Sequence, residues 1–242
     1  MPKQEEKFYI GHRERLKEKF LEDKLTEYEL LELLLSFAIP RRDVKPLSRT
    51  LIKHFGSVYY VMVAEYDELI KVSGVGRSTA ILIKLICEMM KLNHAKVLEN
   101  TQVFYNPKAL EEFCRMQIAG KTNEEVHVIY LDANFKMVKH ELHSRGSIES
   151  SNIYVDKILQ YSLNNGVKSI VLLHNHPVTD NMFSSQDIQI TQTIADTLET
   201  CGLHLYDHYV VASGVLYSMR EKGFLNKSIF HIEQFRDFAT RT

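Results

Sequence analysis

The residues with the clearest chemical potential lie together in the stretch LLHNHPVTDNMFSSQD, residues 172–187. The stretch continues an apolar, β-branched run, so His174 and His176 are expected at the C-terminal end of a buried strand. Residues two apart on a strand point to the same face, and paired imidazoles suit zinc. Asp187, at the expected start of the next helix, can supply a third ligand. Three protein ligands leave one position for water, which is typical of a catalytic zinc site.

The same stretch also has a purely structural interpretation. Ser184 and Asp187 lie three positions apart before an apolar-periodic run, which is the pattern of a helix capping box. Asn175, Pro177 and Asp180 are common turn residues. Spacing alone leaves both interpretations open. A hydrolytic site would also need a general base, and the upstream carboxylates that could serve are Glu124, Glu125, Glu141 and Glu149.

The second half of the chain alternates between strand and helix patterns. The expected strands are residues 124–132, 135–142, 168–176, 203–212 and 215–219. The expected helices are residues 107–118, 151–166 and 184–202. This order predicts a mixed sheet with helices on its faces, in an α/β domain. His204 and His208, on the penultimate strand, are interpreted as packing or surface residues rather than metal ligands.

The first half of the chain has helical periodicity throughout and few strand patterns. We therefore expect two domains: a small all-α domain over residues 1–98, a linker over 99–106, and the α/β domain over 107–242. The first 98 residues hold 17 basic and 14 acidic residues, whereas the remainder holds 13 and 17. This asymmetry places any contact with a polyanion in the helical domain.

The stretch VSGVGRSTA, residues 72–80, is similar to a helix-hairpin-helix motif. Gly74 and Gly76 permit a tight turn and a close approach of the backbone to a phosphate. The helix that follows presents backbone N–H groups to an anion, and Arg77, Ser78 and Thr79 can add phosphate contacts. Such contacts would bind DNA without reading its sequence. The same residues also fit a purely structural alternative, in which the glycine turn joins two packed helices and binds no ligand.

Composition limits the remaining classes of protein. The 242 residues have 45% hydrophobic content and a net charge of −1, as expected of an ordinary globular protein. The longest apolar stretch, residues 30–39, is too short for a transmembrane helix, and the polar first residues do not resemble a signal peptide. Three cysteines without a C-x-x-C spacing fit reduced thiols. We expect a cytoplasmic protein with no membrane partner.

The motif His174-x-His176-Pro177, followed by Ser184 and Asp187, resembles the JAMM (JAB/MPN) metalloprotease motif. The stretches LLHNHP, YDHYVV and LDANFKMVKHELHSRGSIESS are similar to the RadC family, long named as DNA repair proteins, and the resemblance covers nearly the whole chain. The zinc ligands that it implies are His174, His176 and Asp187. It also implies that Ser184 stabilises an oxyanion, and that Glu125 rather than Glu124 is the general base.

The resemblance implies a three-layer α/β/α JAB domain of cytidine-deaminase-like architecture after the helical domain. It further implies a zinc-dependent hydrolase, acting on the peptide or isopeptide bond of an unknown protein substrate. Two alternatives stay open: a non-catalytic DNA-binding protein of DNA repair, and a zinc nuclease. A cytidine deaminase is disfavoured, because the P-C-x-x-C ligand motif of that class is absent from the sequence.

Overall fold

The computed structural model describes residues 4–146, 155–178 and 181–225, and the chain divides into two compact units, Met1–Leu92 and Asn93–Thr242. The division falls within helix α6 (Arg77–Asn100) rather than at the expected residue 98. Residues 99–106 contain the end of α6 and a 3-10 turn, η1 (Val103–Tyr105), rather than an open linker. The reason is apolar burial, because Leu98 and Val103 lie in the core of the second unit.

The first unit is helical, as the periodicity predicts. Its elements before α6 are α1 (Gln4–Leu21), α2 (Glu27–Ala38), α3 (Lys45–Phe55), α4 (Val58–Val63) and α5 (Tyr66–Leu69). A capping box between Thr26 and Glu29 begins α2, and Gly56, at a φ of 96°, ends α3. The helices surround one apolar core that includes Leu35, Leu51 and Ile83.

The second unit contains a five-stranded mixed sheet. Its strands are β1 (Glu125–Leu131), β2 (Met137–Arg145), β3 (Ser169–His176), β4 (His204–Ala212) and β5 (Val215–Ser218). They lie in the order β2-β1-β3-β4-β5, in which β3 and β4 are parallel and the other neighbours are antiparallel. Its helices after α6 are α7 (Pro107–Ile118), α8 (Val155–Asn164) and α9 (Ser185–Thr200).

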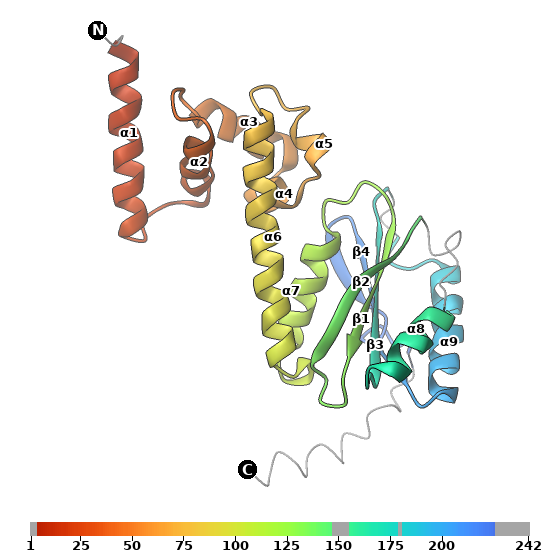
Figure 1. The fold of residues 1–242 in the computed structure, drawn as a ribbon. Coiled ribbons are helices and arrows are strands. Elements are labelled where there is room, and N and C mark those ends of the chain that lie inside the picture. Colours follow the sequence, from red (N-terminus) through yellow and green to blue (C-terminus); the bar gives the residue numbers. More distant parts are fainter. Residues whose placement is uncertain (1–3, 147–154, 179–180, 226–242) are drawn as a thin grey trace. The chain divides into compact units, whose positions relative to one another are not determined.

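Helices cover both faces of this sheet, which gives the α/β/α layers expected from the sequence (Figure 1). On one face, Leu110 and Phe113 of α7 pack against alternate strand residues such as Ile129 and Leu173. On the other face, α8 and α9 pack against the intervening residues, such as Leu172. Full burial of each such side chain contributes about 2 kcal/mol. Because both faces of β1 and β3 are packed, it is determined which side chains of these strands point to which face of the sheet.

None of the helices in the described part of the chain has both the length and the apolarity needed to cross a bilayer.

Candidate metal centre

Strand β3 brings two histidines to one point at its C-terminal end. His174 and His176 lie on the face of the sheet that α9 covers, since they alternate with Leu173 and Asn175 along the strand. His174 is buried, at 2% exposure, and His176 is partly exposed. Their Nε2 atoms are 2.9 Å apart. The sequence prediction that both imidazoles point to one side is therefore confirmed by the structure.

Helix α9 supplies a carboxylate to the same point. Asp187 Oδ1 lies 3.4 Å from His174 Nε2, and Asp187 Oδ2 lies 3.3 Å from His176 Nε2. The capping box is present as well. The backbone N–H of Ser184 donates to Asp187 Oδ2 at 2.7 Å, and that of Asp187 donates to Ser184 Oγ at 3.0 Å. The two interpretations of this stretch are thus compatible, because the cap holds the carboxylate where the histidines meet.

The geometry of these three side chains fits a tetrahedral metal ion. Ligand atoms at zinc distances of 2.0–2.1 Å lie about 3.3 Å from one another in a tetrahedral site. The two Nε2 atoms are 2.9 Å apart, and each of them lies at 3.3 to 3.4 Å from one of the two oxygens of Asp187. Within the described residues, His174, His176 and Asp187 form the one group of His, Cys, Asp and Glu side chains close enough to share an ion. Two imidazoles and a carboxylate are also a donor set that zinc enzymes use.

Hydrogen bonding leaves His176 free to bind a metal through Nε2. Its Nδ1 lies 2.8 Å from the backbone oxygen of Asn181, which can only accept a proton. In the neutral ring the proton therefore lies on Nδ1, and the lone pair on Nε2 points toward His174 and Asp187. A metal-binding histidine usually has its second nitrogen held in this way.

The electrostatics of the cluster suit a cation. Burial alone would raise the pKa of Asp187, but the imidazoles of His174 and His176 beside it hold it far below its ordinary value. Burial lowers the pKa of His174 despite the opposing effect of Asp187. The hydrogen bond with Asp187 raises the pKa of His176. Asp187 is therefore ionised, and its negative charge stabilises a cation placed beside it.

Glu124, the residue before β1, and Glu125, the first residue of β1, have side chains on opposite faces of the sheet. Val126 pairs directly with His174, so these two side chains share a face. Glu124 is two residues before Val126 and has the same direction, whereas Glu125 has the other. Consistent with this, the charge of Glu124 opposes the lowering of the His174 pKa by burial and adds to the effect of Asp187, which raises the pKa of His176.

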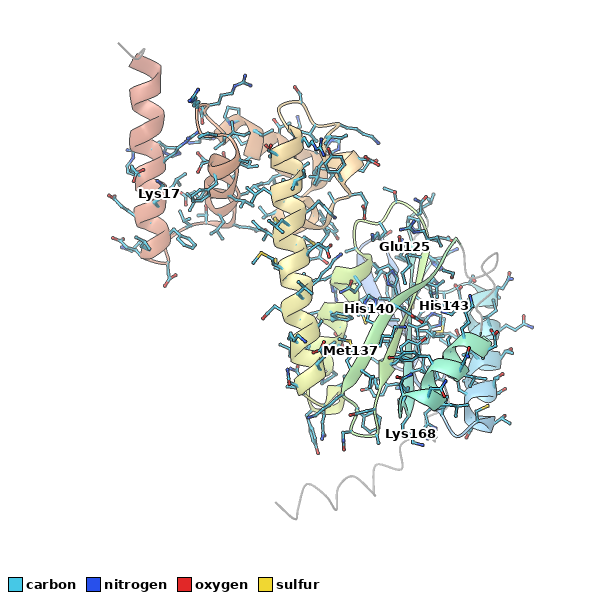
Figure 2. The ribbon with its side chains drawn as sticks, in the orientation of Figure 1. Lys17, Glu125, Met137, His140, His143 and Lys168 are labelled. Carbon is cyan, nitrogen blue, oxygen red and sulfur yellow. The ribbon has the colours of Figure 1, made fainter. Side chains whose placement is uncertain are left out.

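The structure thus directs Glu125, the predicted general base, away from the two histidines. Glu125, labelled at the end of β1 in Figure 2, is buried among polar groups on the face that α7 covers. Its Oε2 lies 3.1 Å from His127 Nε2 and 3.6 Å from Lys121 Nζ, and its Oε1 lies 3.5 Å from Arg145 Nε. The alternation of the strand directs it there, and Glu124 takes the place beside the histidines.

Asn175, between the two histidines, fixes the backbone on both sides of Glu124. Its Oδ1 accepts a hydrogen bond from the N–H of Glu125 at 2.8 Å, and its Nδ2 donates to the carbonyl of Asn123 at 3.0 Å. The side chain of Asn175 is buried on the opposite face from His174. It thus holds the segment that carries Glu124 against β3. Sequence analysis interpreted Asn175 as a turn residue and missed this role.

Two further residues beside the histidines were missed. His208 of β4 is fully buried, with Nε2 2.7 Å from His174 Nδ1, and burial holds its pKa well below the ordinary value. Thr191 of α9 lies 2.6 Å from His208 Nδ1. The stretch YDHYVV placed His208 on a strand but gave no sign of its partner. Of the other carboxylates considered, Glu141 bonds to the hydroxyl of Tyr130, and Glu149 lies outside the described residues.

In the helical unit, the predicted hairpin is formed between α5 and α6. Gly74 has a φ of 94°, a conformation that favours glycine, and Gly76 is the last residue before α6. An added Cβ at Gly76 would meet no atom within 4 Å, so this backbone is open. Arg77 and Ser78 are exposed, whereas Thr79, another expected phosphate contact, is buried. Binding of DNA here stays a prediction.

Comparisons with known proteins agree with this architecture. A family model described as the RadC-like JAB domain matches residues 104–224. A UPF0758 protein of Fusobacterium nucleatum is 33% identical over 230 residues, which cover 91% of this chain and 99% of the relative. A UPF0758 protein of Ruegeria pomeroyi is 34% identical over 218 residues, which cover 88% and 97%.

The fold and the site define a class of protein: an α/β/α domain in which two histidines at a strand end meet an aspartate from the next helix. The matches over most of the chain make the identification more specific. The protein belongs to the RadC-like JAB family.

Proposed function

We propose that the protein is a zinc-dependent hydrolase of the JAMM type that cleaves a peptide or isopeptide bond. The observation that carries this proposal is the convergence of His174, His176 and Asp187 on one point, at separations that fit a tetrahedral ion. Three protein ligands leave a fourth position for water or substrate, as in catalytic rather than structural zinc sites.

The chain supplies the groups that such a hydrolysis needs besides the metal. Zinc bound here would polarise a carbonyl group and lower the pKa of a water molecule. Glu124, on the same face as the histidines, would accept a proton from such a water molecule and pass it to the leaving nitrogen. Ser184 Oγ accepts from the N–H of Asp187 and keeps its own proton, which it donates to the developing oxyanion.

A single metal position favours an acyl-transfer reaction over a nuclease. Many nucleases hold two metal ions about 3.5–4 Å apart, which stabilise both the attacking and the leaving oxygen. In the described residues, one cluster of three ligands is present, and Glu125 is turned to the opposite face from it. The arrangement of one ion, one base and one oxyanion donor suits a carbonyl carbon, as in an amide bond.

The test is a hydrolysis assay on a panel of peptide, isopeptide and nucleic-acid substrates. The zinc-loaded protein should cleave at least one amide substrate, and the His174→Ala/His176→Ala protein should cleave none. A Lys17→Glu protein is the control for purification and folding, because Lys17 lies on α1, distant in sequence from residues 174–187, and it should keep the wild-type activity. Cleavage of nucleic acid but of no amide would replace the proposal with the nuclease alternative. Absence of cleavage by the zinc-loaded protein across the panel would support a binding protein instead.

A further inference from the structure

A chain of hydrogen bonds links His174 to the backbone of α9 through two buried side chains. His174 Nδ1 lies 2.7 Å from His208 Nε2, and His208 Nδ1 lies 2.6 Å from Thr191 Oγ1. Thr191 Oγ1 in turn lies 2.5 Å from the backbone oxygen of Asp187. His208 is 0% exposed and Thr191 is 1% exposed. This series of hydrogen bonds therefore joins β3, β4 and α9, and its side chains are shielded from water.

The last acceptor sets the direction of every proton in this chain. A backbone carbonyl cannot donate, so the Thr191 hydroxyl must donate its single proton to the carbonyl of Asp187. Thr191 Oγ1 is then left to accept from His208 Nδ1–H. A neutral His208 consequently has its lone pair on Nε2 and accepts from His174 Nδ1–H. His174 thus keeps its lone pair on Nε2, the atom that faces His176 and Asp187.

We propose that Thr191 and His208 are positioning residues that hold His174 in its metal-binding tautomer and ring orientation. The inference rests on the proposed function in one respect, namely that His174 is a metal ligand. Neither residue touches the metal position. They act through His174, as the outer hydrogen-bond partners of metal-binding histidines do. Loss of such a partner typically reduces metal affinity about 10- to 100-fold.

The alternative tautomer shows why the direction matters. If Nε2 of His208 carried a proton, it would donate to Nδ1 of His174, and the proton of a neutral His174 would move to Nε2. That proton would occupy the position from which His174 binds a metal. The Thr191 hydroxyl excludes this state, because His208 Nδ1 would then be a second acceptor facing an oxygen whose proton is already donated. The carbonyl of Asp187 thus controls the ligand atom of His174.

Matched substitutions test each link. Thr191→Val keeps the shape and removes the hydroxyl, whereas Thr191→Ser keeps the hydroxyl. His208→Leu removes the acceptor, whereas His208→Gln retains a side-chain oxygen that can accept from His174 Nδ1–H. Zinc affinity, measured by competition with a chelator, should fall about 10- to 100-fold in the Val and Leu proteins. It should change less than about threefold in the Ser and Gln proteins, since these retain the bond. Melting temperatures of the metal-free proteins identify any variant that fails to fold.

A second measurement separates this inference from the zinc assignment. Nitrogen NMR of the histidine rings in the metal-free, full-length protein should show His174 protonated at Nδ1 and unprotonated at Nε2. Thr191→Val should shift part of this population to the other tautomer, and Thr191→Ser should restore it. Wild-type zinc affinity in Thr191→Val, or a proton on Nε2 of His174 in the wild type, would overturn the inference. A wild-type protein that binds no zinc would refute the proposed function, while the ring spectra would still decide the tautomer.

Discussion

Glu124 and Glu125 have the same side chain and adjacent positions, but only one of them faces the histidines. The family resemblance pointed to Glu125, and nothing in the two letters themselves separates them. The pairing of Val126 with His174 separates them, because it fixes which residues on this strand share a face with the two histidines. The convergence of His174, His176 and Asp187 could be predicted from their residue types and spacing. Which of the two glutamates shares a face with the histidines could not be predicted.

Replacing each glutamate by glutamine tests this assignment. Glu124→Gln should leave zinc bound and reduce hydrolysis about 100-fold or more, because it removes the proton acceptor while keeping the shape. Glu125→Gln should retain most of the activity and lose some stability, since a buried carboxylate among Lys121, His127 and Arg145 becomes neutral. Turnover on a substrate found in the panel is the measurement. The reverse pattern, with Glu125→Gln inactive and Glu124→Gln active, would return the role to Glu125.

Asp187 caps α9 and is a proposed metal ligand, and this gives a second prediction at this scale. Asp187→Asn keeps an oxygen for the N–H of Ser184, so the helix start should lose less than about 1 kcal/mol of unfolding free energy. The same change removes the ligand charge and should weaken zinc binding strongly. Thermal unfolding of the metal-free protein and zinc titration are the two measurements. Equal zinc affinity in the Asn and wild-type proteins would reduce Asp187 to a capping residue.

At the scale of elements, β3 and the segment before β1 act as one unit through Asn175. The sequence predicted both strands, and the structure confirms them almost to their ends. The register of the two strands could not be predicted from the sequence. Both strands are continuous apolar runs, so several registers would pair apolar residues equally well. The amide of Asn175, which bonds to the backbone on either side of Glu124, becomes visible only once the register is known.

Asn175→Ala should therefore impair the base without removing the metal. Loss of two buried hydrogen bonds should cost about 1–3 kcal/mol of stability. Hydrolysis should fall more than zinc affinity does, because the segment carrying Glu124 is no longer held. Asn175→Asp retains the acceptor for the N–H of Glu125 and should be intermediate in turnover. Parallel losses of zinc and activity in the Ala protein would show instead that Asn175 supports the ligands.

At the scale of the whole chain, the division into a helical unit and an α/β unit could be predicted from the change in periodicity, but the position of the division could not. Residues 99–106 resemble a connector in composition, with Asn106 and Pro107 at a helix start. Their burial depends on the sheet, since Val103 and Leu98 find apolar partners only when the strands are in place. The predicted hairpin is present, and its ligand stays a proposal.

We propose weak, sequence-independent DNA binding at the exposed start of α6, and a charge reversal tests it. The full-length protein should bind duplex DNA at low salt, with an affinity that falls steeply as salt increases. Arg77→Glu should reduce this affinity and lower the slope of its salt dependence by about one. Lys17→Glu, an equal change of charge at a residue that already pairs with Glu14, is the matched control. Absence of binding at low salt, or equal losses in both variants, would leave the hairpin as a structural turn.

The central claim is that His174, His176 and Asp187 bind one catalytic metal ion, and elemental analysis of the purified protein tests it most directly. Wild-type protein should contain about one zinc per chain, as three ligands around one tetrahedral ion require. The His174→Ala/His176→Ala protein should contain none, while Glu124→Gln should keep the wild-type content. Equal zinc in the wild-type and double-alanine proteins, or a correctly folded wild type that takes up no zinc when the metal is supplied, would contradict the account.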